Sequence, residues 1–197
     1  MLKNPFVVQK VCNYGVTHPI VARCLFQWLD IIQWAKIQNK DELTKSLKKI
    51  QDTLLSCYEI YSDFKSQVDE AEKKWMSQTD IAPNRALNIP SIVGLDVKVS
   101  HFLTNTKHVL RSFGGYFQPI FDDEPKTKDG ELALVYTKDA LNWASSKFGP
   151  ECFLTSHLRD MANPEHPVTH IRNLRDANEH PGGRSGHLHI DNFQYKD

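Results

Sequence analysis

The feature that most constrains this sequence is a long run of apolar side chains at helical spacing. Between Leu43 and Val68 an apolar residue returns at every third or fourth position, and charged residues such as Lys48, Lys49 and Asp52 occupy positions between them. One apolar stripe opposite a charged face is typical of an amphipathic helix that buries one side. The sequence therefore predicts a long helix here, continuing toward Trp75.

Other segments carry shorter helical patterns. A helix is expected to start at Thr17-His18-Pro19, with Thr17 as its cap, and its apolar residues cover much of its circumference up to Ala35. Such a helix is predicted to lie in the core or to meet a partner chain on one side. Asp41 and Asp96 are expected to cap the second and third helices, and further helices are predicted at 137–148 and 152–161.

These patterns predict an all-α fold, an antiparallel helical bundle with a short C-terminal β segment, formed as one domain over residues 1–197. Residues 1–80 are expected to form a long helical hairpin and residues 95–182 the remaining helices. Residues 183–197 are predicted to be a short strand or tail, because Leu188 and Ile190 alternate with polar residues. Short strands are also considered at Phe6-Val7-Val8 and at Leu132–Tyr136, the latter being alternatively the start of a helix.

Composition limits the classes of function. The chain has 197 residues, 40% of them hydrophobic, and a formal net charge of zero, which fits a globular protein and argues against a broad basic surface for nucleic acid. The four cysteines form no C-x-x-C pair, so reduced thiols in a cytoplasmic protein are expected. No signal peptide and no membrane-spanning stretch are recognised, so no membrane association is predicted.

The densest group of chemically useful residues lies between His166 and His189. Pro167 suits the first turn of a helix, Val168, Ile171 and Leu174 give it an apolar face, and Pro181-Gly182-Gly183 ends it. A helix over 166–181 is therefore predicted. Its polar side carries Arg172, Asn173, Arg175, Asp176, Glu179 and His180. Because successive members are four positions apart, Arg172, Asp176 and His180 are expected to form one ladder along the helix.

The segment from Arg175 to His180, R-D-A-N-E-H, resembles the R-x4-6-H motif of the HEPN superfamily. In that family a polar residue follows the arginine, and Asp176 occupies this place. Arg172-Asn173 also resembles the family's R-N pair, although seven residues then separate Arg172 from His180. The resemblance implies a small helical bundle with the motif near the end of its last long helix. It also implies metal-independent cleavage of RNA where two copies of the motif meet in a homodimer, in a toxin or defence protein.

The resemblance assigns roles that are chemically reasonable. Histidine commonly acts as an acid or base in catalysis, and His180 suits this role for attack by the RNA 2′-hydroxyl. Arg175 offers a two-pronged contact to phosphate, and Asp176 is expected to orient His180. Arg172, Asn173, Glu179 and Arg184 are predicted to bind the RNA. No cofactor is expected, and an antitoxin protein is considered as a further partner.

Two alternatives remain open at this point. Charged residues on the outer side of a helix are most often a solvated face, which predicts a non-catalytic helical module that binds a partner protein or nucleotide. In addition, His187 and His189 would share one face of a strand and, together with His180, would suit a metal such as Zn²⁺.

Overall fold

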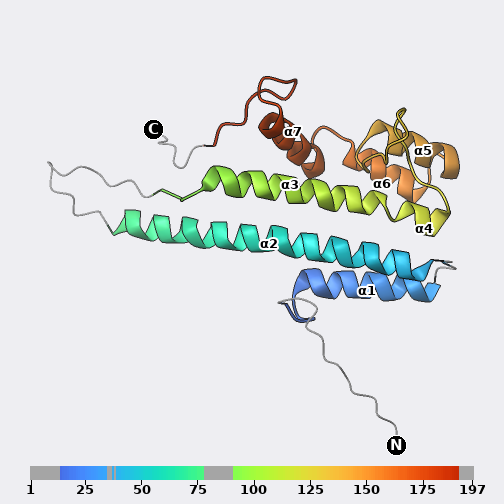
Figure 1. Cartoon of the computed structure of the whole chain (residues 1–197), viewed down its shortest axis with the longest axis horizontal. Coiled ribbons are helices and arrows are strands. Elements are labelled where there is room, and N and C mark those ends of the chain that lie inside the picture. The colour runs from blue at the N-terminus through green and yellow to red at the C-terminus, as the bar shows by residue number, and fades with distance from the viewer. Residues whose placement is uncertain (1–13, 35–36, 38, 78–90, 191–197) are drawn as a thin grey trace, which may run out of the picture.

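The fold is all-α. A computed structural model describes residues 14–34, 37, 39–77 and 91–190, and within these ranges the chain forms seven helices and no β-strand (Figure 1). The predicted helical bundle is therefore confirmed. The helices are α1 (Pro19–Trp34), α2 (Lys40–Met76), α3 (Leu95–Gly114), α4 (Phe117–Phe121), α5 (Lys138–Phe148), α6 (Phe153–Met161) and α7 (Pro167–Glu179).

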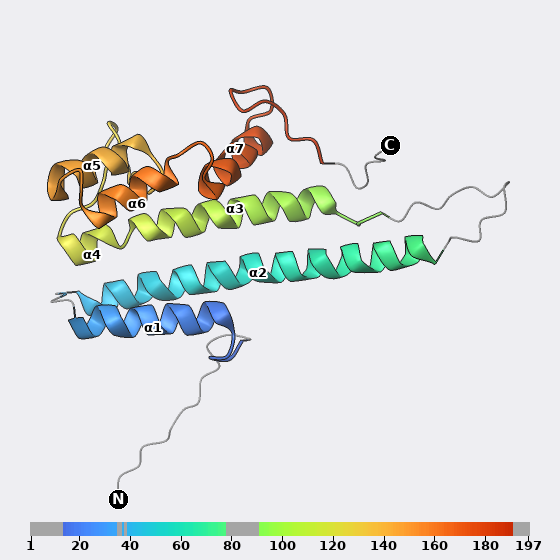
Figure 2. The ribbon, with the colours of Figure 1, turned by 180° about the vertical axis from the view of Figure 1, so that it is seen from behind.

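The long helix α2 organises the arrangement. α1 runs antiparallel along the first half of α2. α3 runs antiparallel along another side of α2, where it overlaps most of that half and extends beyond it to about Phe64 (Figures 1 and 2). Leu43, Ile50 and Leu55 of α2 are buried at 0%, 2% and 5% exposure, so the apolar stripe predicted from the sequence faces the neighbouring helices. α7 lies on α3, on the side of the hairpin away from α1.

A compact cluster at the end of α3 supports α7. Leu110, Phe117, Val135, Tyr136 and Leu158 are buried together, and Val168 of α7 packs against them. The segment Leu132–Tyr136 is neither a strand nor a helix start: Leu132 makes an isolated bridge to Lys126, and Val135 and Tyr136 enter the core through a turn. The short helix α4, which was not predicted from the sequence, contributes Phe117 to this cluster.

The helix starts differ from prediction in their capping residues. His18, not Thr17, caps α1, because its Nδ1 accepts a hydrogen bond from the backbone N–H of Ile20 at 3.3 Å. In α7 the His166 Nδ1 likewise accepts a hydrogen bond from the backbone N–H of Val168, at 3.2 Å. Each of these histidines precedes a proline in the first turn, and proline has no N–H that needs a partner there.

The sequence prediction was also wrong about the capping residues of α2 and α3. α2 is capped by Asn39, not Asp41. The Asn39 Oδ1 accepts from the N–H of Glu42, and the Asn39 Nδ2 donates to the Glu42 carboxylate at 2.7 Å. This pairing resembles a capping box, except that the side-chain amide of Asn39 and not its backbone N–H donates to the carboxylate. α3 begins after Gly94 at φ 65°, a left-handed conformation that glycine adopts easily. Asp96 therefore lies inside the first turn of α3.

The predicted C-terminal β segment does not form where the structure describes it. Residues 181–186 make a turn closed by a bridge between Gly183 and Gly186, and residues 187–190 are irregular. A strand needs a neighbouring strand to pair its backbone groups, and the described ranges offer none. The proposed strand at Phe6-Val7-Val8 and the end of the C-terminal one lie outside the described residues.

None of the helices in the described ranges combines the length and the apolar character needed to cross a membrane.

Candidate functional site

α7 is fixed on the bundle by one side, which determines where its polar residues lie. Thr169 and Ala177 are buried at 3% and 6% exposure. The Thr169 hydroxyl donates to the carbonyl oxygen of Met161 at 3.1 Å, and the Asn178 amide donates to the Ser100 hydroxyl of α3 at 3.1 Å. These bonds lie at both ends of the helix, so they set its position along α3 and its rotation.

Arg175 lies at the edge of this packed side. Its side chain is only 13% exposed, and its guanidinium donates to Asp176 at 3.0 Å and, in a close ion pair, to Glu179. Glu179 sits one helical turn after Arg175, the spacing at which helical side chains meet. Arg175 is therefore held in one orientation by two carboxylates from its own helix.

A second cation joins this group from α3. Lys107 Nζ lies 3.6 Å from the same Glu179 oxygen. The hydrogen bond from Arg175 is the main cause that lowers the pKa of Glu179, and the charges of Arg175, Lys107 and His180 add to it against the effect of burial. Two cations and two carboxylates thus neutralise each other at the end of α7.

This pairing predicts a pH-dependent contribution to stability. Because the pKa of Glu179 is lowered in the folded protein, its stabilising effect is complete above the ordinary glutamate pKa of about 4.3 and is lost as pH falls through the folded value. Glu179→Gln should therefore lower the free energy of unfolding most at neutral pH, and its difference from the wild type should shrink on acidification. Urea unfolding of both proteins from about pH 7 to about pH 3 measures this; a difference that does not change with pH would contradict it.

Tyr136 forms the floor beneath both arginines. It is 4% exposed, and the Arg172 guanidinium carbon lies 5.6 Å from the centre of its ring, a cation–π contact. Burial raises the pKa of Tyr136, and the nearby charge of Arg175 is the largest effect that opposes this rise. The Arg175 Nε is buried and has no hydrogen-bond partner among the described residues.

His180 is exposed and lies just beyond the helix. α7 ends at Glu179, and the backbone of His180 leaves the helical path with φ −131° and ψ 67°, although its N–H still bonds to the Asp176 carbonyl oxygen at 2.9 Å. The predicted ladder is therefore wrong. Within the described ranges Arg172 bonds to Asn173, and no hydrogen bond joins the Asp176 carboxylate to either Arg172 or the His180 imidazole.

The remaining predicted residues lie after α7. Arg184 is exposed in the turn at 181–186. His187 and His189 are exposed with ring centres 6.3 Å apart. Where the structure describes the chain, no three histidine, cysteine or acidic side chains are grouped so that they could hold a metal ion.

Three residues of this site were not identified from the sequence. Lys107 and Ser100 lie on α3, some 70 to 80 positions before the residues they contact. Tyr136 was recognised only as part of an apolar run. Nothing in the local pattern separates these positions from other surface or core residues, so only the packing of α7 on α3 reveals them.

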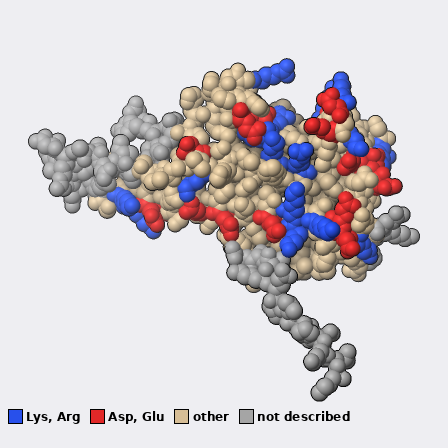
Figure 3. Space-filling model, viewed as in Figure 1, with Lys and Arg blue, Asp and Glu red and all other residues tan. Residues whose placement is uncertain are grey.

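Two other surface properties bear on function. On the face shown in Figure 3, lysine and arginine alternate with aspartate and glutamate, so any attraction for a polyanion there is local.

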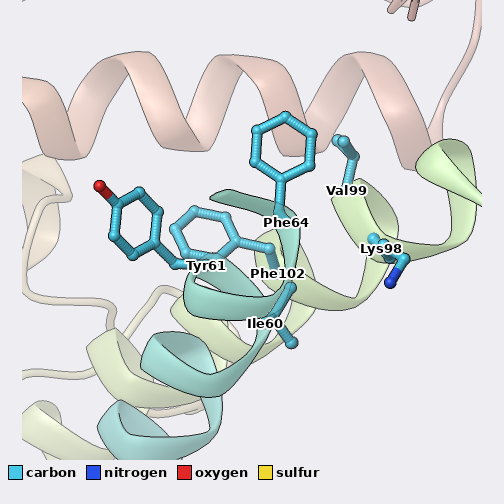
Figure 4. A pocket seen from close by; sticks show the side chains of 6 residues that line it. All are labelled: Ile60, Tyr61, Phe64, Lys98, Val99 and Phe102. Atoms are coloured by element: carbon cyan, nitrogen blue, oxygen red, sulfur yellow. The ribbon is translucent and has the colours of Figure 1, made fainter. Parts of the chain in front are cut away.

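A hollow of about 220 Å³ lies between α2 and α3. The rings of Tyr61, Phe64 and Phe102 gather on one side of it, with Val99 and Lys98 on the other (Figure 4).

Comparisons of the chain with protein-family models, curated proteins and solved structures found no match.

Proposed function

We propose that the C-terminal end of α7 is the active site of a metal-independent endoribonuclease of the HEPN type that acts on single-stranded RNA as a homodimer. The observation that carries this proposal is the contrast between two neighbouring groups. Arg175 is held rigidly by Asp176 and Glu179, whereas the His180 imidazole that follows is exposed. A fixed guanidinium and an accessible imidazole at the same end of one helix would supply charge stabilisation and proton transfer.

The reaction needs three contributions. The 2′-oxygen attacks the adjacent phosphorus, the bond from phosphorus to the 5′-oxygen breaks, and the products are a 2′,3′-cyclic phosphate and a 5′-hydroxyl. One imidazole accepts the 2′-hydroxyl proton and another donates a proton to the leaving 5′-oxygen. Arg175 stabilises the negative charge that grows on the phosphate oxygens.

The reaction needs two proton-transfer groups, and a second copy of the chain would supply the second one. One α7 carries one His180, and a two-fold axis beside its C-terminal end would bring the same imidazole from the partner. Arg172 and Asn173 lie on α7 about two turns before this end, and Arg184 lies in the turn after it. All three are exposed or half-buried and would bind RNA on either side of the cleaved bond. A protein that covers this surface would inhibit the enzyme, and an antitoxin is a partner of that kind.

Glu179 acquires a specific role under this proposal. It occupies the Arg175 contact that a phosphate group would use, and it also pairs with Lys107. A phosphodiester must therefore displace the Glu179 carboxylate before Arg175 can bind it. Displacement would release two cations toward the RNA, which suits a protein whose overall charge is balanced.

The decisive experiment is cleavage in the absence of divalent metal. Purified protein incubated with single-stranded RNA in EDTA should produce fragments that end in a 2′,3′-cyclic phosphate, identified by mass spectrometry. Activity that requires added metal, or fragments that carry a 5′-phosphate, would contradict the proposal. Cleavage should also increase with protein concentration in the range where the dimer forms, as measured by analytical ultracentrifugation.

A non-catalytic helical module is the second candidate, and the self-neutralised site favours it. With both Nη atoms of Arg175 occupied by carboxylates, the cluster also serves as an ion-pair network that fastens α7. Under this alternative, RNA remains intact in EDTA at every protein concentration, while α7 and the apolar hollow of Figure 4 form a protein-binding surface.

A further inference from the structure

A second hollow lies on the seam between α2 and α3, near the start of α2 and the end of α3. Its volume is about 220 Å³, below the range of about 300–1,000 Å³ that drug-sized ligands occupy, so it suits one small chemical group. None of the described residues that line it belongs to α7 or to the apolar hollow of Figure 4. It is therefore separate from the residues proposed to cleave RNA.

The walls of this second hollow are basic and carry hydroxyl groups. Lys49 of α2 faces it from one side of the seam, and His108 and Arg111 of α3 face it from the other. Ser46 and Ser112 add one hydroxyl from each helix. The described residues of this wall include no aspartate or glutamate, so we call it the basic hollow.

The other end of the same seam shows how a cation between these helices is balanced by a carboxylate. There Lys98 of α3 forms a close ion pair with Asp63 of α2. Lys49 and Arg111 come from the same two helices, yet neither makes an ion pair with any described residue. Two like charges that face one small hollow repel each other, and a bound anion would replace this repulsion by attraction.

The end of α3 accounts for only part of this arrangement. Arg111 lies in the last turn of α3, where a cation is favourable beside the carbonyl groups of the helix end. Lys49 belongs to another helix and lies in its interior, so the same reason does not apply to it. The carbonyl groups would also oppose an anion, but the Phe113 oxygen among them is occupied by the N–H of Tyr116 at 3.2 Å.

The charges and donors of the basic hollow indicate the class of anion. Lys49 and Arg111 carry two positive charges, and a phosphate monoester carries about −1.5 to −2 at neutral pH, whereas a phosphodiester carries one negative charge. The Arg111 guanidinium can bind two phosphate oxygens at once. The Ser46 and Ser112 hydroxyls and one ring N–H of His108 can each donate a further hydrogen bond. This set matches a terminal phosphate group better than a phosphodiester.

We propose that the basic hollow binds the terminal phosphate group of a phosphate monoester. Arg111 and Lys49 hold the phosphate oxygens from the two sides of the seam, and the serine hydroxyls and His108 donate to the oxygens that remain. The rest of the ligand extends into solvent, because Lys49, His108 and Arg111 are exposed. This binding does not depend on the proposed ribonuclease activity.

Two small probes of different charge test this proposal. Methyl phosphate is a monoester with a charge of about −2 at about pH 8, and dimethyl phosphate is a diester with one negative charge. At constant ionic strength, methyl phosphate should shift the backbone amide NMR signal of Gly115, which lines the basic hollow in the full-length protein. It should also bind about threefold to fivefold more tightly than dimethyl phosphate, as expected for one more exposed ion pair. No shift at Gly115, or equal affinity for the two probes, would overturn the proposal.

Matched lysine variants locate the binding. Lys49→Gln removes a charge from the basic hollow, and Lys45→Gln removes the same charge one turn earlier on α2, at an exposed position outside the lining. Lys49→Gln should weaken methyl phosphate binding by about threefold to fivefold, and its combination with Arg111→Gln should abolish the shift at Gly115. Lys45→Gln should bind nearly as the wild type does. Equal losses in the two single variants would show only a general attraction for anions and would overturn the proposal.

A last comparison distinguishes a small phosphate monoester from the phosphorylated end of an RNA. A short 2′-O-methyl RNA lacks the attacking hydroxyl, so it stays intact, and it can carry either a 5′-phosphate or a 5′-hydroxyl. A shift at Gly115 with the 5′-phosphate form alone would support the proposal and extend the ligands to RNA ends. A shift with methyl phosphate and with neither RNA would support it for small molecules. Equal shifts with both RNAs would mean that internal phosphodiesters bind, which contradicts it.

Discussion

Replacement of His180 by alanine is expected to lower the rate of RNA cleavage by about 10²- to 10⁴-fold, the usual contribution of a proton-transfer group. The imidazole is exposed beyond the end of α7 and makes no side-chain hydrogen bond to any described residue. Its removal should therefore leave the free energy of unfolding nearly unchanged. Single-turnover cleavage in EDTA and urea unfolding of the same preparations measure the two effects separately.

The matched control for this variant is His170→Ala. His170 is exposed on the same helix and lies outside the proposed active-site segment 175–180, so its loss should change neither cleavage nor stability. Cleavage by His180→Ala at the wild-type rate would remove the imidazole from the mechanism. Equal losses of activity in both variants would indicate instead that α7 tolerates no change of surface charge.

The helix positions were largely predictable because they depend on local periodicity. The apolar stripe from Leu43 to Val68 predicted α2. Pro167 at the start and Pro181-Gly182 at the end predicted both ends of α7 to within two residues. The capping residues were less predictable, because Thr17, Asn39 and Asp41 all suit a helix start, whereas His18, which caps α1, is not one of the usual capping residues. Only the geometry of the turn before each helix decides which side chain reaches the free N–H groups.

The residues that α7 contributes to the candidate site could be named from the sequence, but their contacts could not, nor could Lys107, Ser100 and Tyr136. The spacing rule placed Arg172, Asp176 and His180 on one ladder, yet α7 ends at Glu179 and the next residue leaves the helical path. Arg175 meets Glu179 at the same four-residue spacing. Arg175–Glu179 therefore forms where Arg172–Asp176 and Asp176–His180 were expected. Two residues far from α7 in the sequence favour this arrangement, because Tyr136 holds Arg172 at its ring and Lys107 also pairs with Glu179.

Those contacts also identify which arginine should matter more. Arg175→Ala is expected to lower the cleavage rate by about 10²- to 10³-fold, as for the loss of a group that stabilises transition-state charge. It should also lower the free energy of unfolding by about 1–3 kcal/mol, because two charge-assisted hydrogen bonds disappear from a side chain that is 13% exposed. The same measurements on Arg172→Ala should show smaller effects, with a stability loss of no more than about 1 kcal/mol from its contact with the Tyr136 ring.

Arg175→Lys separates the structural effect of this residue from the catalytic one. Lysine keeps the positive charge beside Asp176 and Glu179 but lacks the planar fork that binds two phosphate oxygens at once. Its stability should therefore lie closer to that of the wild type than to that of Arg175→Ala, while its cleavage rate remains low. If Arg172→Ala loses activity and both Arg175 variants cleave normally, Arg172 is the phosphate-binding arginine. In that case the ion-pair cluster of Arg175, Asp176, Glu179 and Lys107 serves only to hold α7 on α3.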